Sequence, residues 1–170
     1  MEQQMLKDKV AIITGASYGM GRTMAELFAE EGAALVITAR HQEKLDEVVD
    51  GIQAKGGKAV GVVADVCATE DTQRVFETAL KEFGDVDILI NNAGMYPAML
   101  VTDVTEKHFD RVIAVNLKGT FFVTQAVVNQ SMIPNNYGRI VNISSCDGET
   151  PASGVAIYGA AKAGVISLTK

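Results

Sequence analysis

The stretch Val10-Ala11-Ile12-Ile13-Thr14-Gly15-Ala16-Ser17-Tyr18-Gly19-Met20-Gly21 decides the fold of this 170-residue chain. Its first four residues are apolar and predict a buried strand, and its three glycines predict a tight turn. A helix is expected to follow over 22–31, with Gly32 as its stop. Glycines let a backbone approach a bulky anion, and a helix N-terminus carries partial positive charge. The stretch is therefore typical of a phosphate-binding turn, although a plain turn of small residues would have the same composition.

The same alternation of short apolar runs and longer amphipathic segments continues along the chain. Strands are expected at 10–14, 34–39, 59–63, 87–91 and 139–143, and helices at 22–31, 43–55, 69–83, 105–133 and 156–170. The strands are continuous apolar runs, as in a sheet covered on both faces. This order predicts an α/β fold, a doubly wound parallel sheet (Rossmann-like, three-layer αβα) that binds ligands outside the carboxyl ends of its strands. We expect residues 1–170 to form a single domain.

Composition and charge narrow the function classes. Acidic residues number 21 against 15 basic ones, for a net charge of −6, which disfavours nucleic acid and anionic membrane surfaces as partners. Cys67 and Cys146 are far apart and predict free thiols in a reducing compartment. The first nine residues are polar and lack an apolar signal segment, and no apolar run is judged long enough to span a bilayer. A cytoplasmic protein is the resulting prediction.

The end of the second expected strand bears on the choice of cofactor. The strand ends Thr38-Ala39-Arg40, without the carboxylate that binds a ribose 2′-hydroxyl in many dinucleotide-binding folds. A guanidinium offers several donors to a 2′-phosphate. The sequence therefore favours NADP over NAD, with a merely solvated Arg40 as the alternative.

Three segments carry candidate chemistry. Tyr158 and Lys162 are four residues apart, so a helix would place them on one face, where the ammonium stabilises the phenolate and prepares the phenol for proton exchange with a carbonyl or alcohol. Ser145 lies thirteen residues before the tyrosine, at the end of the fifth expected strand, with Ser144 as its rival. Asn116 lies inside the expected long helix, where asparagine is a poor residue, and is therefore either exposed or functional.

Taken together, these motifs resemble the short-chain dehydrogenase/reductase family. The turn matches its Thr-Gly-x-x-x-Gly-x-Gly motif, 91–94 its Asn-Asn-Ala-Gly motif, and 158–162 its Tyr-x-x-x-Lys pair. The resemblance implies Tyr158 as general acid/base, Lys162 as its tuning cation and ribose contact, Ser145 as the substrate-orienting hydroxyl and Asn116 as the anchor of a proton relay. No metal is implied. The cofactor contacts that it implies are Gly15, Ser17, Tyr18, Gly19, Met20, Gly21, Arg40, Asp65, Val66, Asn92, Ala93, Gly94, Tyr158 and Lys162.

The expected function is hydride transfer between NADP(H) and a small carbonyl or alcohol substrate. A 3-oxoacyl-carrier-protein reductase shares every motif quoted, and a non-catalytic nucleotide-binding module would need the glycine turn alone. Family members continue beyond this point with further strands and a substrate loop, and they often form homotetramers. We therefore expect the chain to be incomplete at its C-terminus. His41 and His108 are interpreted as surface residues and Cys146 as a packed thiol. Met95, Tyr96, Pro97 and Met99 follow the fourth expected strand and are candidates for the wall of a substrate cleft, with ordinary loop packing as the alternative.

Overall fold

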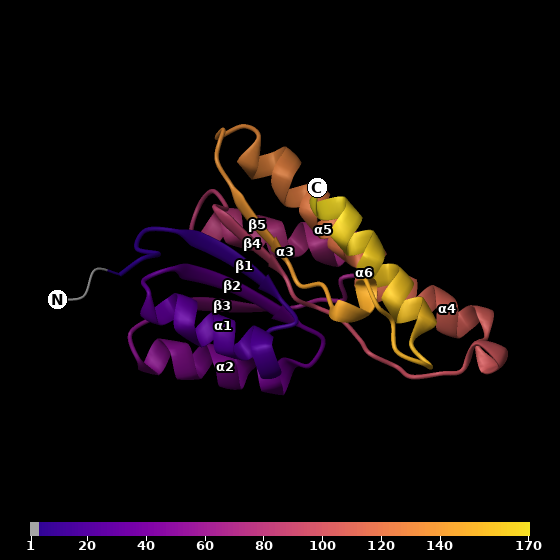
Figure 1. Cartoon of the computed structure of the whole chain (residues 1–170). Helices are drawn as coiled ribbons and strands as arrows, with labels where there is room; N and C mark the ends of the chain where they lie inside the picture. The colour runs from indigo at the N-terminus through magenta and orange to yellow at the C-terminus, as the bar shows by residue number, and fades with distance from the viewer. Residues whose placement is uncertain (1–3) are drawn as a thin grey trace.

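A computed structural model describes residues 4–170, so the first three residues of the polar start lie outside the described part. Five parallel strands form one sheet in the order β3-β2-β1-β4-β5 (Figure 1). The strands are β1 Val10–Thr14, β2 Ala34–Ala39, β3 Lys58–Val63, β4 Ile88–Asn91 and β5 Arg139–Asn142. The order reverses between β1 and β4, and a doubly wound sheet opens a crevice for ligands at such a point. The predicted α/β fold is confirmed.

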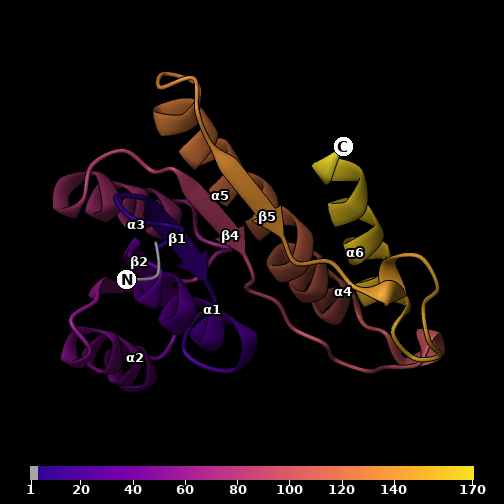
Figure 2. The ribbon, with the colours of Figure 1, turned by 60° about the vertical axis from the view of Figure 1, so that its left-hand side comes forward.

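Helices cover both faces of the sheet. The α-helices are α1 Gly19–Glu30, α2 Gln42–Ala54, α3 Thr69–Glu82, α4 Glu106–Ile113, α5 Gly119–Val127 and α6 Ala156–Thr169. Short 3₁₀ segments lie at Val101–Asp103 (η1) and Cys146–Gly148 (η4). Figures 1 and 2 show α1 and α2 on one side of the sheet, and α3, α5 and α6 on the other.

Alternate residues of the strands feed two separate cores. On one face, Ile13 and Ile37 pack with the buried side chains of α1 and α2. On the other face, Ile12, Val36 and Leu89 pack with the buried side chains of α3 and α5. The period of two along each strand thus gives every strand an apolar residue for each layer, which is why the runs are continuously apolar.

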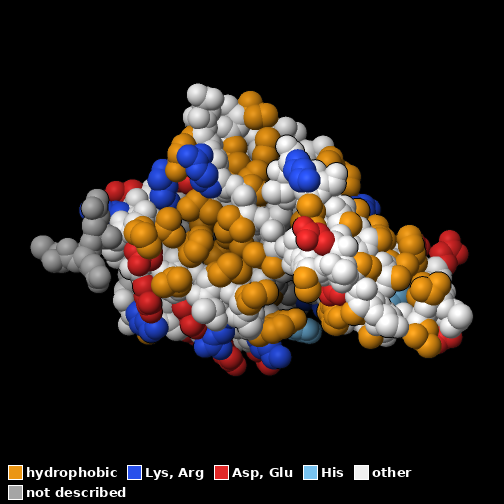
Figure 3. All heavy atoms as spheres, viewed as in Figure 1, with side chains coloured by type: hydrophobic (Ala, Val, Ile, Leu, Met, Phe, Trp, Pro, Cys, Tyr) orange, Lys and Arg blue, Asp and Glu red, His pale blue; other side chains and the backbone are white. Residues whose placement is uncertain are grey.

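The outer strand β5 is less covered than the others. Val141 pairs in register with Ile90, so both side chains face the α1 layer, yet Val141 is 46% exposed. Figure 3 shows apolar side chains gathered over this part of the sheet, above α1 in the view of Figure 1. Within residues 4–170, no helix packs over β5 on this face. β5 is also the last strand of the sheet, paired with β4 alone among the described residues.

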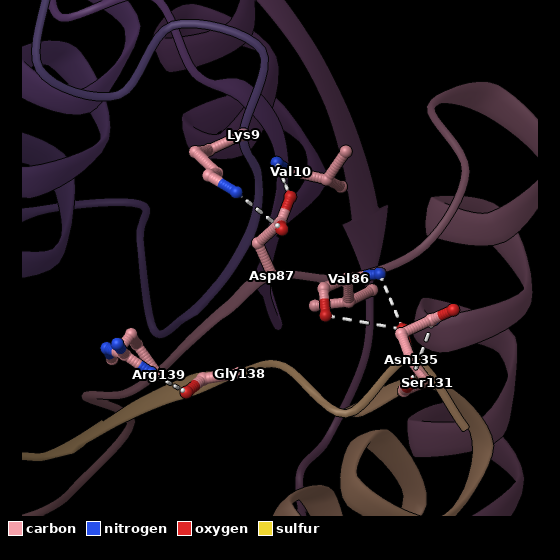
Figure 4. A network of polar contacts seen from close by, with 8 residues as sticks. All are labelled: Lys9, Val10, Val86, Asp87, Ser131, Asn135, Gly138 and Arg139. Carbon is pink, nitrogen blue, oxygen red and sulfur yellow. Dashed lines mark hydrogen bonds and ion pairs between the residues drawn. The ribbon is translucent and has the colours of Figure 1, made fainter. Parts of the chain in front are cut away.

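Polar contacts fix the amino end of β4, opposite the crevice (Figure 4). The Asp87 carboxylate accepts hydrogen bonds from Lys9 Nζ (3.1 Å) and from the Val10 N–H (2.9 Å). The buried Ser131 hydroxyl accepts from the Val86 N–H (2.7 Å) and donates to the Val86 carbonyl (3.3 Å). These bonds tie β4 to β1 on one side and to the end of the long helix on the other.

The element ends differ from the prediction in two informative places. Helix α1 begins at Gly19, three residues earlier than expected, because the glycine turn itself forms the first helical turn. The helix expected over 105–133 runs over Glu106–Met132 but widens into π segments at Ala114–Lys118 (η2) and Val128–Met132 (η3). Asn116 Nδ2 donates to the Val112 carbonyl (3.0 Å), which competes with the backbone for that acceptor and accounts for the first widening.

The prediction that no apolar run is long enough to span a bilayer is wrong for this long helix. Glu106–Met132 is long and apolar enough by length and composition alone. Its Val123, Val127 and Met132 are buried in the core beside α3, which is the usual position of an apolar helix inside a globular domain.

Candidate active site

The glycine turn between β1 and α1 presses directly against the end of β4. A Cβ on Gly15 would lie 2.8 Å from the Cα of Ala93, and one on Gly21 would lie 2.5 Å from Asn92 Nδ2. Gly15 and Gly19 also have φ angles of +67° and +56°, which favour glycine. Larger residues would therefore disrupt the turn, and its bare backbone forms one wall of the crevice.

The Asn-Asn-Ala-Gly segment holds that turn in place. Asn92 Nδ2 donates to the carbonyls of Thr14 and Gly15 (3.0 Å each). The Thr14 hydroxyl oxygen accepts from the Asn92 and Ala93 N–H groups (3.0 Å each). The segment thus joins β4 to β1 at the point where the strand order reverses.

A cleft of about 690 Å³ opens at the carboxyl ends of the strands, a size typical of ligand sites. Of the predicted site residues, all except Ser145 line it, namely Gly15, Ser17, Tyr18, Gly19, Met20, Gly21, Arg40, Asp65, Val66, Asn92, Ala93, Gly94, Asn116, Tyr158 and Lys162. One cleft therefore brings together segments that lie more than 140 residues apart in the chain.

Tyr158 and Lys162 lie on the first turns of α6. Lys162 is only 4% exposed, and its Nζ lies 5.7 Å from the centre of the Tyr158 ring. The ammonium donates to the Ile143 carbonyl (2.6 Å) at the end of β5, and burial lowers the pKa of Lys162. Tyr96 meets the Tyr158 ring edge-on, with ring centres 4.7 Å apart. The pair therefore shares a face of the cleft, and Tyr96 supports the phenol from the loop after β4.

The two candidate serines differ in their surroundings. Ser144 lines the cleft, and its hydroxyl donates to the Lys162 carbonyl (3.1 Å). The Ser145 hydroxyl instead lies 3.2 Å from Asp147 Oδ2 and accepts from the Asp147 N–H (3.1 Å). Ser145, the predicted substrate-orienting hydroxyl, is thus engaged by Asp147 and does not line the cleft, whereas its neighbour Ser144 does.

Asn116 is fully buried rather than exposed. Its Oδ1 accepts from the Met95 N–H (3.1 Å), and its Nδ2 donates to the carbonyls of Met95 (3.1 Å) and Val112 (3.0 Å). The side chain therefore fastens the loop after β4 to the long helix. This structural duty explains an asparagine at a helix-interior position without reference to catalysis.

At the far end of the cleft, Asp65 follows β3. Its Oδ2 lies 3.3 Å from Arg111 of α4, and its Oδ1 accepts from the Cys67 N–H (3.0 Å). Burial alone would raise the pKa of Asp65, but the bonds from Cys67 and the charge of Arg111 outweigh it and lower that pKa. Asp65 is therefore an ionised acceptor at the rim of the cleft.

Sequence reasoning missed several lining residues. Three are basic or potentially basic, His41, Lys44 and Arg111, and they add to Arg40 in the same cleft. The position of Lys44 in the first helical turn after Arg40 could have indicated a second cation at the cleft. His41 is exposed, as predicted, but it also lines the cleft. Cys146 is exposed, so the prediction of a packed thiol is wrong. Of the four residues expected as cleft walls, Met95 and Tyr96 line the cleft, whereas Pro97 and Met99 do not.

The cleft suits an extended ligand with an anionic part. Its glycine wall offers unobstructed backbone, and the N-terminus of α1 has neither a side-chain cap nor an acidic residue in its first turn. The Thr38 hydroxyl on β2 is buried against the cleft with no hydrogen-bond partner among the described residues, which leaves one polar atom to be satisfied there. These features fit a dinucleotide.

A doubly wound parallel sheet with a glycine turn at its reversal point defines a Rossmann-like nucleotide-binding domain. Residues 9–170 match the family described as short chain dehydrogenase, and the chain belongs to that family.

Named relatives lead to the same family. The chain is 42% identical to (2S)-((R)-hydroxy(phenyl)methyl)succinyl-CoA dehydrogenase subunit BbsD of Thauera aromatica, over 97% of this chain and 66% of the relative. It is 41% identical to a 3-oxoacyl-acyl-carrier-protein reductase, FabG, of Thermotoga maritima, over 97% and 67%. The chain thus spans about two thirds of the length of these relatives.

Two solved structures are similar to this chain over nearly all of its length. An actinorhodin polyketide ketoreductase with NADPH has a TM-score of 0.92 at 31% identity, with 95% of this chain and 62% of that chain covered. An NAD⁺-bound xylitol dehydrogenase has a TM-score of 0.92 at 36% identity, with 97% and 64% covered.

Proposed function

We propose that this chain is the cofactor-binding and catalytic part of an oxidoreductase that transfers a hydride between NADP(H) and a carbonyl or alcohol substrate. The observation that carries the proposal is that Tyr158 and Lys162 face the same cleft as the glycine turn. A non-catalytic nucleotide-binding module would need the turn but not this pair.

The residues that would hold the cofactor follow from the cleft. The turn 15–21 and the N-terminus of α1 would bind the pyrophosphate through backbone N–H groups. Asp65 and Val66 would bind the adenine end, and 92–94 would flank the nicotinamide end. The choice of NADP over NAD rests on Arg40, with Lys44 beside it as a second cation for a 2′-phosphate. The similar structures include both an NADPH-bound and an NAD⁺-bound protein, so similarity alone favours neither.

The chain's own residues would manage the proton. The bound nicotinamide supplies or accepts the hydride. Tyr158 donates its phenolic proton to the substrate oxygen during reduction and takes it back during oxidation. The buried ammonium of Lys162 stabilises the phenolate left behind, because charges interact strongly where water is excluded. Ser145 orients the substrate oxygen through its hydroxyl, and Asn116 holds the loop that carries Tyr96 beside the phenol.

The printed names of two relatives indicate a substrate class. The BbsD name specifies a hydroxyl-bearing succinyl-CoA derivative, and the FabG name specifies a 3-oxoacyl group on a carrier protein. A 3-oxoacyl thioester is therefore the preferred substrate class. A 3-oxoacyl-carrier-protein reductase fits this class, and a reductase of a small free ketone is the alternative. A homotetramer and a cytoplasmic location stay predictions.

The test is reduction of acetoacetyl-CoA by NADPH, with Tyr158→Phe compared with Tyr96→Phe in the full chain. Both variants remove one phenolic hydroxyl from the same cleft, but only the first removes the proposed proton donor. We expect Tyr158→Phe to lower turnover by about 10²–10⁴-fold, the usual contribution of a general acid. Tyr96→Phe should retain turnover near the wild-type level. Equal rates for the two variants would disprove the assignment.

A further inference from the structure

Asp147 is a buried carboxylate next to the proposed active site that neither the motifs nor the mechanism uses. It lies in η4, two residues after Ser145, and is 8% exposed. Its Oδ1 accepts from the Ala152 N–H (3.0 Å), and its Oδ2 lies 3.2 Å from Ser145 Oγ. Burial of a carboxylate is unfavourable unless its partners are well placed, so both contacts bear on why an acid occupies this position.

The hydrogen-bonding capacity of Ser145 shows what Asp147 does to it. A serine hydroxyl has one proton to donate and two lone pairs to accept with, whereas an ionised carboxylate can only accept. Ser145 therefore donates its single proton to Asp147 Oδ2. One of its lone pairs is already engaged by the Asp147 N–H (3.1 Å). In this arrangement Ser145 can accept one further hydrogen bond and can donate none.

That state conflicts with binding of a ketone. A carbonyl oxygen only accepts, so it cannot be held by a hydroxyl whose proton is committed elsewhere. The Ser145 hydroxyl must therefore break its hydrogen bond to Asp147 before it can donate to the substrate oxygen. Ser145 does not line the cleft in this structure, where its hydroxyl is engaged by Asp147.

The loop around Asp147 packs closely against α6. A Cβ on Gly159, the residue after Tyr158, would lie 2.7 Å from the Asp147 carbonyl oxygen. A Cβ on Gly148 would lie 2.9 Å from the Lys162 carbonyl carbon. The loop therefore packs backbone to backbone on α6, and the adjustment falls on the Ser145 side chain rather than on the loop.

We propose that Asp147 is a positioning residue that holds the Ser145 hydroxyl in an acceptor-only state until a substrate oxygen competes for its proton. This inference rests on the proposed function, because it assigns Asp147 a role through Ser145. Asp147 sets how tightly a carbonyl is bound, without touching substrate or cofactor.

Asp147→Asn separates this role from simple structural support. The oxygen of the introduced amide must face the Ala152 N–H, because the alternative orientation would oppose two donors. The NH₂ group of that amide then faces Ser145 Oγ, which accepts its hydrogen bond and keeps its own proton free for the carbonyl. The variant should therefore bind a carbonyl more tightly than the wild-type protein, which a residue that merely supports the loop would not predict.

The experiment measures KM and kcat for acetoacetyl-CoA with NADPH, and the dissociation constant of NADPH by nicotinamide fluorescence, in the full chain. We expect Asp147→Asn to lower KM by about tenfold, the size of one hydrogen bond to a charged group, with kcat and NADPH affinity unchanged. In a Ser145→Ala background the same substitution should leave KM unchanged. Glu149→Gln removes an exposed carboxylate from the same loop and is the matched control for charge alone.

An unchanged or raised KM in Asp147→Asn, or an equal fall in KM with and without Ser145, would overturn the inference. The proposed function fails separately, when Tyr158→Phe retains turnover. A Tyr158→Phe variant without turnover, together with a silent Asp147→Asn variant, would remove the role of Asp147 and leave the proposed function standing.

Discussion

Asn116→Ala tests the claim that this residue fastens the loop after β4. The substitution removes three hydrogen bonds and leaves the Met95 N–H and the Met95 carbonyl without their partners. The Val112 carbonyl loses its side-chain partner as well, but it lies within the helix. The damage should therefore concentrate on the loop that carries Tyr96 to the catalytic tyrosine.

The magnitude follows from the orphaned backbone groups. Leaving a fully buried donor or acceptor unsatisfied costs about 1–3 kcal/mol, and because both Met95 groups are only partly buried, the two together should cost roughly 1–3 kcal/mol. Urea unfolding would measure this loss as a lower midpoint with an unchanged m-value. Hydrogen exchange at the Met95 amide should accelerate more than exchange at β1 amides, because the loop loosens locally.

Asn116→Asp is the matched control. It keeps an acceptor for the Met95 N–H but sets an oxygen against the Met95 and Val112 carbonyls, so it should destabilise the protein without releasing the Met95 amide. A loss below about 0.5 kcal/mol for Asn116→Ala, typical of an ordinary surface substitution, with unchanged exchange at Met95, would refute the reasoning.

Three further outcomes are expected. Gly21→Ala should weaken NADPH binding about 10–100-fold by calorimetry, because its Cβ would collide with the turn, whereas Gly51→Ala, with open space around it, should bind normally. Ser131→Ala should lower the free energy of unfolding by about 1–3 kcal/mol, because it leaves the N–H and the carbonyl of Val86 without their side-chain partner. Burial raises the pKa of Cys67 to about 11, so its alkylation should be slow at pH 8 and should accelerate as the pH rises toward about 11. The exposed Cys146 should be alkylated first. Normal NADPH binding by Gly21→Ala, unchanged stability of Ser131→Ala, or equal alkylation rates for the two cysteines would each contradict the corresponding prediction.

Much of the fold could be predicted because its signals are local. The run 10–14 and the run 34–39 coincide with β1 and β2, since short, mostly apolar runs that end at turns fit strands of a sheet buried on both faces. The π widening at Asn116 could not be predicted, because it depends on which carbonyl the buried amide reaches. That contact is set by the packing of the loop after β4.

The site divides in the same way. Glycine spacing and the separation of Tyr158 from Lys162 are properties of the chain itself, and they predicted residues that share one cleft. Side-chain direction is not such a property. The sequence ranks Ser145 by its spacing from the tyrosine, but the direction of its hydroxyl depends on Asp147, and that depends on how the loop packs against α6.

The central claim is that the cleft between the glycine turn and Tyr158 binds a nicotinamide dinucleotide. Titration of NADPH into the protein, followed by its fluorescence, tests this most directly. The account predicts saturable binding of one molecule per chain, tighter for NADPH than for NADH, with the difference reduced in Arg40→Ala. Absence of saturable binding for both nucleotides would contradict it.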